Sequence, residues 1–372
     1  MRIPRDHAPP EEPEVLEAPT GVEPELVEEA LEEAVKGLAN LLSRLEKLRD
    51  VMEGLRGSGR VRRLGPGAQT CYLAVDSGFT SPPIEVLGGY LSLVQVATVP
   101  YGPACGGPPT KVLYVHFNPE RDDTDAFARV KEREHALAGL RWLEGVEGPK
   151  ALLIDGEVVP RFGARRRASG EGVVEEAIRK SRELIMEALG RGIPVIGVLK
   201  RSFSRDVAVA EGLGPDLTDR ALMSALLGEG EYFVAGTYRE IHASFSEKAP
   251  KDLRWRAEWL RWAASDDVFG DVVVAFYRPA HSLFPTATKV ELAVPEGVGV
   301  GEVLSSLAAV SESTGLPAPI DYVDALSRIG PETVYTVYQL LLNRLSGLSK
   351  EAAEVLMAVV NPQKLGPLGF VT

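Results

Sequence analysis

Apolar residues recur every three or four positions between Pro24 and Arg56, with charged residues between them. This spacing predicts an amphipathic helix of roughly three heptads, interrupted where Arg49 falls on the apolar stripe. Pro24 suits the first helical position, because its missing N–H would be unpaired there in any case. The helix either packs on its own domain or pairs with a second subunit or a partner protein. Residues 1–23, with five prolines among acids, predict a leader with little drive to fold.

The apolar pattern changes after residues 57–67, a stretch of glycine and arginine that we interpret as a linker. Beyond it, apolar runs of strand length alternate with helical stretches. The predicted strands are residues 70–75, 84–87, 90–99, 111–117, 151–154, 194–199, 232–235, 272–277 and 289–293. The predicted helices are residues 123–144, 173–189, 219–227, 322–328 and 332–343. Because this alternation is typical of parallel strands covered on both faces, it predicts one α/β domain behind a helical arm.

Composition narrows the class of protein. No apolar run approaches the ~20 residues that cross a bilayer, and no signal-peptide pattern opens the sequence, so we expect a cytoplasmic protein without membrane contact. Cys71 and Cys105 are too few for a disulfide framework or a cysteine zinc site. The net charge of −12 argues against a general DNA coat, but a nucleic-acid enzyme with local basic clusters remains open. Four asparagines and four glutamines beside abundant charged residues are typical of a thermophile.

Two aspartates stand at the ends of predicted strands. Asp76 ends the run LAVD and Asp155 ends ALLID, and a glycine follows each within two residues. In an open α/β sheet, ligands gather beyond the carboxyl ends of the strands, where a half-buried carboxylate is costly unless it is hydrogen-bonded or bound to a cation. Either aspartate alone could simply cap an Asp-Gly turn. Together, on strands that could be neighbours, they predict a metal site.

Hard divalent cations such as Mn²⁺ and Mg²⁺ prefer carboxylate ligands, and two of them can activate water and stabilise the leaving oxygen in phosphodiester cleavage. Such a pair of ions needs further acids. Glu134 is the candidate on the predicted helix 123–144, where it shares a stripe with Val130 and Leu137, although a surface role is the alternative. Glu132 lies about 160° away around that helix and is predicted to face solvent.

Basic residues follow the predicted strand ends. They are Arg161, Arg165, Arg166, Arg167, Lys200, Arg201 and Arg205. If the strand ends share one edge of the sheet, these residues form a positive border around an acidic centre, which suits binding of a DNA backbone. A solvated run of charges is the alternative for each cluster. Lys200 has two candidate roles, contact with a phosphate or balance of the carboxylate charge.

Other motifs are absent or weak. The sequence contains no P-loop, no GxGxxG and no GxSxG, which removes those nucleotide-binding and hydrolase interpretations. We interpret His242 and His281 as structural histidines. The helical stripe of Trp255, Trp259 and Trp262 is interpreted as core or interface packing rather than a surface for base stacking.

A series of short motifs runs through residues 70–345. In order they are LAVDSGFT, IEVLGGYLSLVQVATV, ALLIDGEVVPRF, IPVIGVLKRSFSRD, TDRALMSALLGEGEYF and GLPAPIDYVDALSRI. This series resembles the NurA nucleases of archaea and some bacteria. The resemblance implies a ribonuclease-H-like mixed sheet flanked by helices, and a manganese-dependent (or Mg²⁺-dependent) 5′ to 3′ exonuclease with single-strand endonuclease activity. It also implies a homodimer that acts on DNA with the hexameric ATPase HerA, in end resection for recombinational repair.

The resemblance also assigns individual residues. The two metal-binding aspartates of the family fall on Asp76 and Asp155, its helix glutamate falls on Glu134 with Glu132 as the alternative, and its lysine falls on Lys200. We expect two metal ions. The residues expected to hold the DNA backbone are Arg161, Arg165, Arg166, Arg167, Lys200 and Arg201. The expected domains are a flexible leader (1–23), a helical arm and linker for dimer or partner contact (24–66), the nuclease domain (67–345), and a C-terminal helix and tail (346–372).

Two departures from the family pattern bear on the site. The acidic turns read Asp-Ser-Gly and Asp-Gly-Glu, where the family has Asp-Gly-Ser. Asp324, in PIDYVD, stands where the family has a metal-binding histidine. Aspartate is also a ligand for hard ions, so we expect Asp324 to complete the metal site. The alternatives are a catalytically decayed scaffold subunit and an ATPase of the actin and sugar-kinase superfamily, for which residues 297–301 are a weak glycine-rich signal.

Overall fold

The computed structural model describes residues 24–47, 49–86, 88–119, 123–162, 172–213, 217–249 and 251–349. The contacts between residues divide the chain into two units, residues 1–54 and 55–372. The predicted leader, most of the predicted tail, and Arg165, Arg166 and Arg167 lie outside the described residues. The predicted domain boundaries at residues 66 and 345 stay predictions.

The predicted amphipathic helix is present as two helices. They are α1 (Pro24–Lys47) and α2 (Arg49–Gly57), and the first unit contains α1 and the start of α2. Leu31, Val35 and Leu38 on α1 are 59–60% exposed, so this helix presents an apolar stripe. Among the described helices, none combines the length and the apolar character that crossing a membrane requires.

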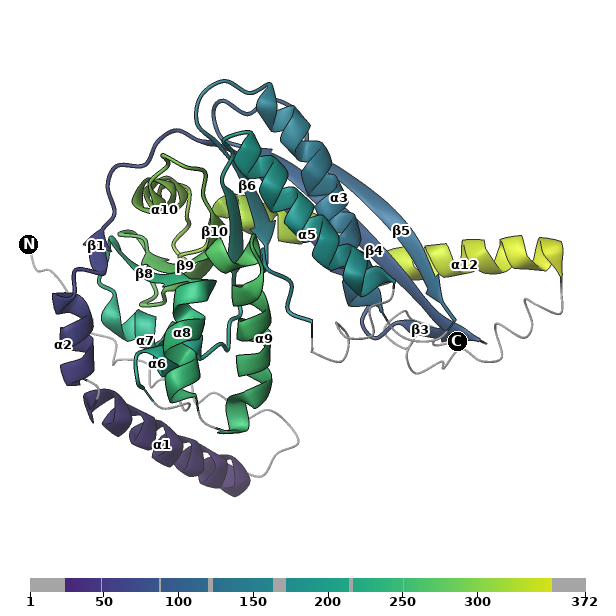
Figure 1. The fold of residues 1–372 in the computed structure, drawn as a ribbon. Helices are drawn as coiled ribbons and strands as arrows, with labels where there is room; N and C mark the ends of the chain where they lie inside the picture. Colours follow the sequence, from purple (N-terminus) through teal and green to yellow (C-terminus); the bar gives the residue numbers. More distant parts are fainter. Residues whose placement is uncertain are drawn as a thin grey trace, which may run out of the picture. The chain divides into compact units, whose positions relative to one another are not determined.

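The second unit contains a mixed sheet, in which the described residues form ten strands (Figure 1). The strands are β1 (Val61–Arg63), β2 (Cys71–Phe79), β3 (Ile84–Val86), β4 (Gly89–Tyr101), β5 (Thr110–Asn118), β6 (Lys150–Asp155), β7 (Val195–Leu199), β8 (Glu231–Thr237), β9 (Val273–Arg278) and β10 (Thr288–Ala293). Their order is β1-β8-β9-β10-β7-β6-β2-β4-β3, with β5 paired to β4. Each strand predicted from the sequence corresponds to one of these.

The five strands β5-β4-β2-β6-β7 form the part of the sheet that carries the candidate site. β4 pairs antiparallel with β5 and with β2, whereas β6 runs parallel to β2 and β7 runs parallel to β6. A helix connects the third of these strands in the chain, β5, to the fourth, β6. This order and these directions are those of the ribonuclease-H-like fold, so the predicted fold class is confirmed.

Beyond β7, the strands β10, β9, β8 and β1 extend the sheet by antiparallel pairing. β1 lies within residues 57–67, which we interpreted only as a linker. Val61 and Arg63 lie opposite Phe233 and Glu231 of β8. A strand of three residues is too short to show a period of two in the sequence, so its pairing could not be predicted.

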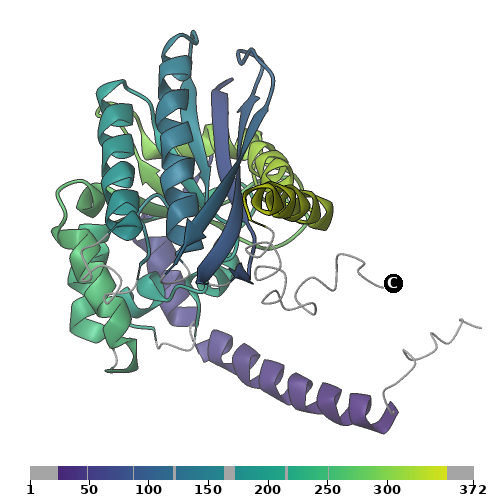
Figure 2. The same ribbon diagram turned by 90° about the vertical axis from the view of Figure 1, so that its right-hand side faces the viewer.

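Helices cover the two faces of the sheet in separate groups (Figure 2). On one face, α3 (Thr124–Glu144) packs beside α5 (Val173–Gly190) and against β2. On the other face, α10 (Val300–Ala309) and α11 (Ala318–Ser327) share an apolar core with alternate residues of the central strands. α12 (Pro331–Leu348) follows α11. The central strands are buried because both of their faces are covered.

A further group of helices packs around α8 (Tyr238–Lys248), which contacts α6 (Asp206–Ala210) and α9 (Arg254–Ser265). The shorter elements nearby are α7 (Asp219–Leu226) and the 3₁₀ turns Lys251–Leu253 and Phe269–Asp271. On α9, Trp259 is buried with its ring edge-on to Tyr238, as the predicted packing role requires. Trp255 is 67% exposed, so it does not pack in the core, and interface packing stays a prediction for it.

A disulfide joins Cys71, the first residue of β2, to Cys105 in the loop after β4. The two Cα atoms lie 5.2 Å apart although 34 positions separate the residues in the sequence. The register of β2 and β4 brings them together, since Tyr72 lies opposite Tyr101. From the sequence, two cysteines are too few for a framework, and their number alone does not tell whether they pair.

Candidate metal centre

Three carboxylates converge at the carboxyl ends of the central strands. Asp76 lies on β2, Asp155 is the last residue of β6, and Asp324 lies on α11. One carboxylate oxygen from each residue lies within 4.8 Å of one from each of the others. We call these residues the Asp triad. The predicted convergence of the three aspartates is therefore present in the fold.

Strand register explains why Asp76 and Asp155 meet. β2 and β6 run parallel with Val75 opposite Ile154, so the next residue of each strand is an aspartate at the same edge of the sheet. Side chains alternate between the faces of a strand. The residues two positions before the two aspartates belong to the core shared with α10 and α11. Both aspartates therefore face α11, which carries Asp324.

Close packing between β2 and the end of α11 places Asp324. A Cβ atom at Gly78 would lie 2.2 Å from the Ser327 carbonyl oxygen, so a larger residue at that position would push the helix away. The Ser327 hydroxyl donates a hydrogen bond to Asp76 at 2.5 Å. The Gln95 side-chain amide donates to two carbonyl oxygens at the end of α11, at 2.6 and 3.2 Å. These contacts hold Asp324, one helical turn before Ser327, close to Asp76.

Two cations balance part of the negative charge. The Lys200 ammonium lies 2.6 Å from Asp155 and 3.0 Å from Asp324, and the Arg328 guanidinium lies 2.5 Å from the second oxygen of Asp324. Burial acts to raise the pKa of Asp324, but hydrogen bonds from Lys200 and Arg328 outweigh it and hold that pKa below its usual range. Of the two roles considered for Lys200, the geometry favours balance of the carboxylate charge.

The two strand aspartates resist ionisation. Burial and then the nearby Glu132 carboxylate raise the pKa of Asp76 to about 6. Burial and then the Asp76 carboxylate raise the pKa of Asp155 to about 7, although Lys200 acts against the shift. Both shifts come from keeping negative charges close together away from water. A bound cation removes this repulsion, so the arrangement suits a metal ion.

The helix glutamate that faces this region is Glu132 rather than Glu134. Glu132 is buried, and it accepts hydrogen bonds from the Ser77 hydroxyl at 2.7 Å and from Arg129 at 3.1 Å. The Glu134 carboxylate instead lies 2.8 Å from the Lys131 ammonium on a partly exposed side of α3. The prediction that Glu132 faces solvent is wrong, because α3 packs against both β2 and α5 and therefore buries more than one stripe.

Glu132 approaches the Asp triad from the other side of β2. Its partner Ser77 follows Asp76 and therefore points to the face that α3 covers. Arg133, which is buried, and Arg129 both pair with Glu132, and Arg129 also lies 3.3 Å from Glu157 just after β6. These contacts fix the orientation of the Glu132 carboxylate.

The predicted basic border is described only in part. Arg161 lies 2.6 Å from Glu291, a buried acid on β10, so its charge balances that acid. Arg201 is exposed directly after Lys200. The arginines at positions 165–167 lie outside the described residues. Contact of these residues with DNA stays a prediction.

The donor set of the Asp triad fits a hard divalent cation. It offers carboxylate oxygens, which Mg²⁺ and Mn²⁺ prefer, at separations that one ion or a close pair can bridge. The two cysteines are joined in a disulfide and supply no thiolate. Glu132 supplies a further carboxylate close enough to raise the pKa of Asp76. The Asp triad and Glu132 therefore fit the Mn²⁺ or Mg²⁺ that we expect from the sequence.

Comparison with known proteins agrees with this geometry. The family model described as the NurA domain matches residues 72–329. The crystal structure of the NurA nuclease from Sulfolobus solfataricus is similar with a TM-score of 0.52 and 13% identity, over 85% of this chain and 97% of that chain. A crystal structure of NurA with manganese is similar with a TM-score of 0.50 and 13% identity, over 83% and 97% of the two chains. At such low identity these similarities concern the fold. No curated protein matches the chain.

Proposed function

Because this chain belongs to the NurA domain family, we propose that it is a metal-dependent DNA nuclease whose active site is the Asp triad. The observation that carries the proposal is the convergence of Asp76, Asp155 and Asp324 within 4.8 Å at the carboxyl ends of the central strands. Ligands gather at this edge in open α/β sheets. The turns after Asp76 and Asp155 differ from the family pattern, and position 324 has an aspartate in place of a histidine. Neither difference removes a carboxylate from the Asp triad.

The residues of the site have separate roles in this proposal. The Asp triad holds one or two Mn²⁺ or Mg²⁺ ions, which when bound activate water and stabilise the leaving oxygen. Glu132, held by Ser77 and Arg129, supplies an oriented fourth carboxylate. Lys200 balances the triad and lies where it can meet a phosphate of the substrate. Substrate phosphates bring negative charge, so a cation at this position favours their approach.

The cellular role is proposed from the family resemblance. It comprises 5′ to 3′ exonuclease and single-strand endonuclease activity in DNA end resection, performed by a homodimer together with a HerA-type hexameric ATPase. The exposed apolar stripe of α1 supports this part of the proposal, since it offers a helical surface for a second subunit or for the ATPase. Cleavage of substrates labelled at the 5′ or the 3′ end tests the polarity. Size-exclusion chromatography with light scattering tests the dimer.

Cleavage of a labelled single-stranded oligonucleotide by the purified full-length protein tests the activity. We expect products with Mn²⁺ and none with EDTA. Asp76→Asn should lower kcat by more than about 100-fold, because a ligand that helps hold ions worth several kcal/mol of transition-state stabilisation is lost. The control is Asp267→Asn, since Asp267 is 80% exposed and pairs with Arg182, away from the Asp triad. Equal cleavage by Asp76→Asn and the unchanged protein would contradict the proposal.

The same assay distinguishes the two helix glutamates. Glu132→Gln should lower kcat by about 10- to 100-fold, because it removes a carboxylate that borders the metal site. Glu134→Gln should leave kcat within about 2-fold, since the Glu134 carboxylate pairs with Lys131 instead. The reverse order of effects would restore Glu134 as the helix ligand.

The alternatives from the sequence give different results in this assay. ATP hydrolysis without strand cleavage would favour an ATPase. The glycine-rich residues 297–301 do not require one, because packing accounts for Gly301: a Cβ there would lie 2.5 Å from the Tyr232 hydroxyl. Absence of both activities would favour a scaffold subunit.

A further inference from the structure

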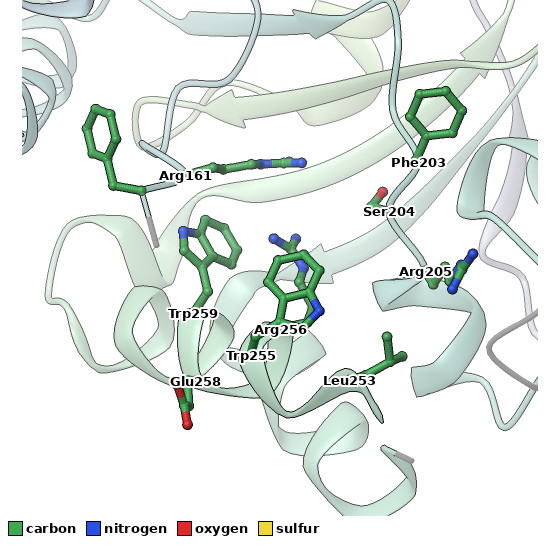
Figure 3. A pocket seen from close by; sticks show the side chains of 10 residues that line it. Arg161, Phe203, Ser204, Arg205, Leu253, Trp255, Arg256, Glu258 and Trp259 are labelled. Atoms are coloured by element: carbon green, nitrogen blue, oxygen red, sulfur yellow. The ribbon is translucent and has the colours of Figure 1, made fainter. Parts of the chain in front are cut away.

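A pocket of about 550 Å³ lies beyond the carboxyl ends of β6 and β7 (Figure 3). Asp155 of the Asp triad is the last residue of β6, so the triad lies at the same ends of the strands. Its walls come from the loops after these two strands and from α9. The residues that matter here are Arg161, Phe203, Arg205, Trp255, Arg256 and Trp259. The lining also includes one acidic residue, Glu258. Arg161 and Arg205 belong to the predicted basic border, and the other residues of the pocket have no role in the proposed function.

One wall of the pocket is fixed by internal contacts. Arg256 donates to both carboxylate oxygens of Asp206, and Arg161 pairs with Glu291. Both guanidinium groups also lie over the ring of Trp259, at 4.2 and 5.5 Å from its centroid. The charges of these two arginines are therefore balanced within the protein, and the three side chains form a preorganised wall.

The other groups are open to a ligand. Trp255 is 67% exposed and Phe203 is 84% exposed. Arg205 has a buried Nε atom without a hydrogen-bond partner among the residues that the structure describes. In Figure 3 the segment with Phe203 and Arg205 lies on one side of the pocket, and α9 with Trp255 lies on the other. Large aromatic side chains this exposed mark a contact surface.

We propose that this pocket binds a nucleotide of single-stranded DNA adjacent to the bond that is cut, with its base against Trp255 or Phe203 and its phosphate beside Arg205. Exposed aromatic rings combined with arginines are how proteins hold single strands without regard to sequence. The volume lies in the range of sites for small ligands. The proposal rests on the proposed nuclease function and adds the residues that hold the nucleotide next to the cut.

The distance along the chain supports this placement. Phe203 follows Lys200 by three residues, so their Cα atoms lie within about 11 Å of each other. The Lys200 ammonium contacts Asp155 and Asp324 of the Asp triad. Glu291, the partner of Arg161, lies between two residues of the core shared with α10 and α11, so it points to the opposite face of the sheet. A strand with one phosphodiester at the triad therefore passes over the ends of β6 and β7 to place a neighbouring nucleotide in the pocket. In a duplex, the faces of each base are covered by the neighbouring base pairs and are not open to Trp255 or Phe203, so duplex DNA fits the pocket poorly.

Binding of fluorescein-labelled oligo-dT to the full-length protein, measured by anisotropy in EDTA, tests the pocket without cleavage. Trp255→Ala and Phe203→Ala should each raise Kd by about 5- to 150-fold, the range that corresponds to about 1–3 kcal/mol per stacked base. Arg205→Gln should weaken binding and reduce its salt dependence. The matched control is Trp142→Ala, since Trp142 is 36% exposed near the end of α3. We expect that variant to bind like the unchanged protein.

A second substrate separates the pocket from the metal centre. Bis(p-nitrophenyl) phosphate is a phosphodiester without bases, so Trp255→Ala should keep its Mn²⁺-dependent turnover while KM for the oligonucleotide rises. If the unchanged protein cleaves neither substrate but Trp255→Ala still weakens oligo-dT binding, the nuclease proposal fails and the pocket proposal stands. Equal oligo-dT affinity of Trp255→Ala, Phe203→Ala and the unchanged protein would overturn the pocket proposal, and the two rings would then belong to a protein contact.

Discussion

At the scale of single residues, the fold treats the three aspartates of the metal centre differently. Asp76 and Asp155 lie at buried strand ends, where their charges repel each other and their pKa values rise. Asp324 is more exposed and is held by Lys200 and Arg328, which keep its pKa low. In the absence of metal, the ionised form of Asp76 therefore opposes folding, whereas the ionised form of Asp324 supports it.

Thermal unfolding of the metal-free protein should reveal this difference. A carboxyl group whose pKa is raised in the folded state binds more protons folded than unfolded, so its contribution to stability falls as pH rises through that window. For Asp76 the window runs from its ordinary value of 3.8 to about 6. Asp76→Asn should thus gain stability relative to the unchanged protein between pH 4.5 and pH 8, by roughly 1–3 kcal/mol.

Asp324→Asn is the contrasting variant, measured by the same melting curves in EDTA. It removes a carboxylate whose pKa is lowered, so it should lose stability relative to the unchanged protein as pH rises toward the ordinary pKa of 3.8, and the difference should then persist at higher pH. Addition of Mn²⁺ should raise the Tm of the unchanged protein more than that of either variant. A pH dependence for Asp76→Asn that matches the unchanged protein would contradict the electrostatic account.

At the scale of helices and strands, the sequence predicted the strands and the parallel core well, because long buried strands carry strong apolar runs. It also placed Asp76, Asp155 and Asp324 at one site. The ends of the predicted strands locate Asp76 and Asp155, and the motif resemblance locates Asp324. It misjudged Glu132, because the period of a helix identifies its faces but not how many neighbours cover them. The pairing of β1 and the exposure of Trp255 were not predicted for a similar reason. Each depends on tertiary contacts, which a local sequence pattern does not determine.

The packing of β2 against α11 predicts the effect of one methyl group. Gly78→Ala places a Cβ against the Ser327 carbonyl, so α11 must shift, which should cost about 1–3 kcal/mol and displace Asp324. Mn²⁺-dependent cleavage should fall with it. Gly190→Ala on α5 is the control, because a Cβ there meets nothing within 4 Å. Unchanged melting and cleavage for Gly78→Ala would show that α11 adapts without cost.

At the scale of the whole molecule, the metal centre draws on parts of the chain that are far apart. The Asp triad comes from residues 76, 155 and 324, so it forms only when the central strands and α11 have assembled. The proposed nucleotide pocket depends on a different set, the loops after β6 and β7 together with α9. Substitutions in the pocket can therefore change DNA binding without disturbing the triad.

The disulfide predicts how the molecule responds to reducing agents. Replacing both Cys71 and Cys105 by alanine should lower the free energy of unfolding by about 4 kcal/mol, because a closed loop of this length restricts the unfolded chain. Dithiothreitol should lower the Tm of the unchanged protein and leave that of the double variant unaffected. Two free thiols appearing with no loss of Tm would contradict this estimate.

The crosslink also has a topological consequence. Residues 71–105 form a covalent ring that contains Asp76 and the strands β2 to β4, while Asp155 and Asp324 lie outside it. In strong denaturant the oxidised chain stays tethered at these two points. On dilution of the denaturant, β2, which carries Asp76, therefore pairs with β4 across a short closed loop. Asp155 and Asp324 must come to the site from more distant parts of the chain.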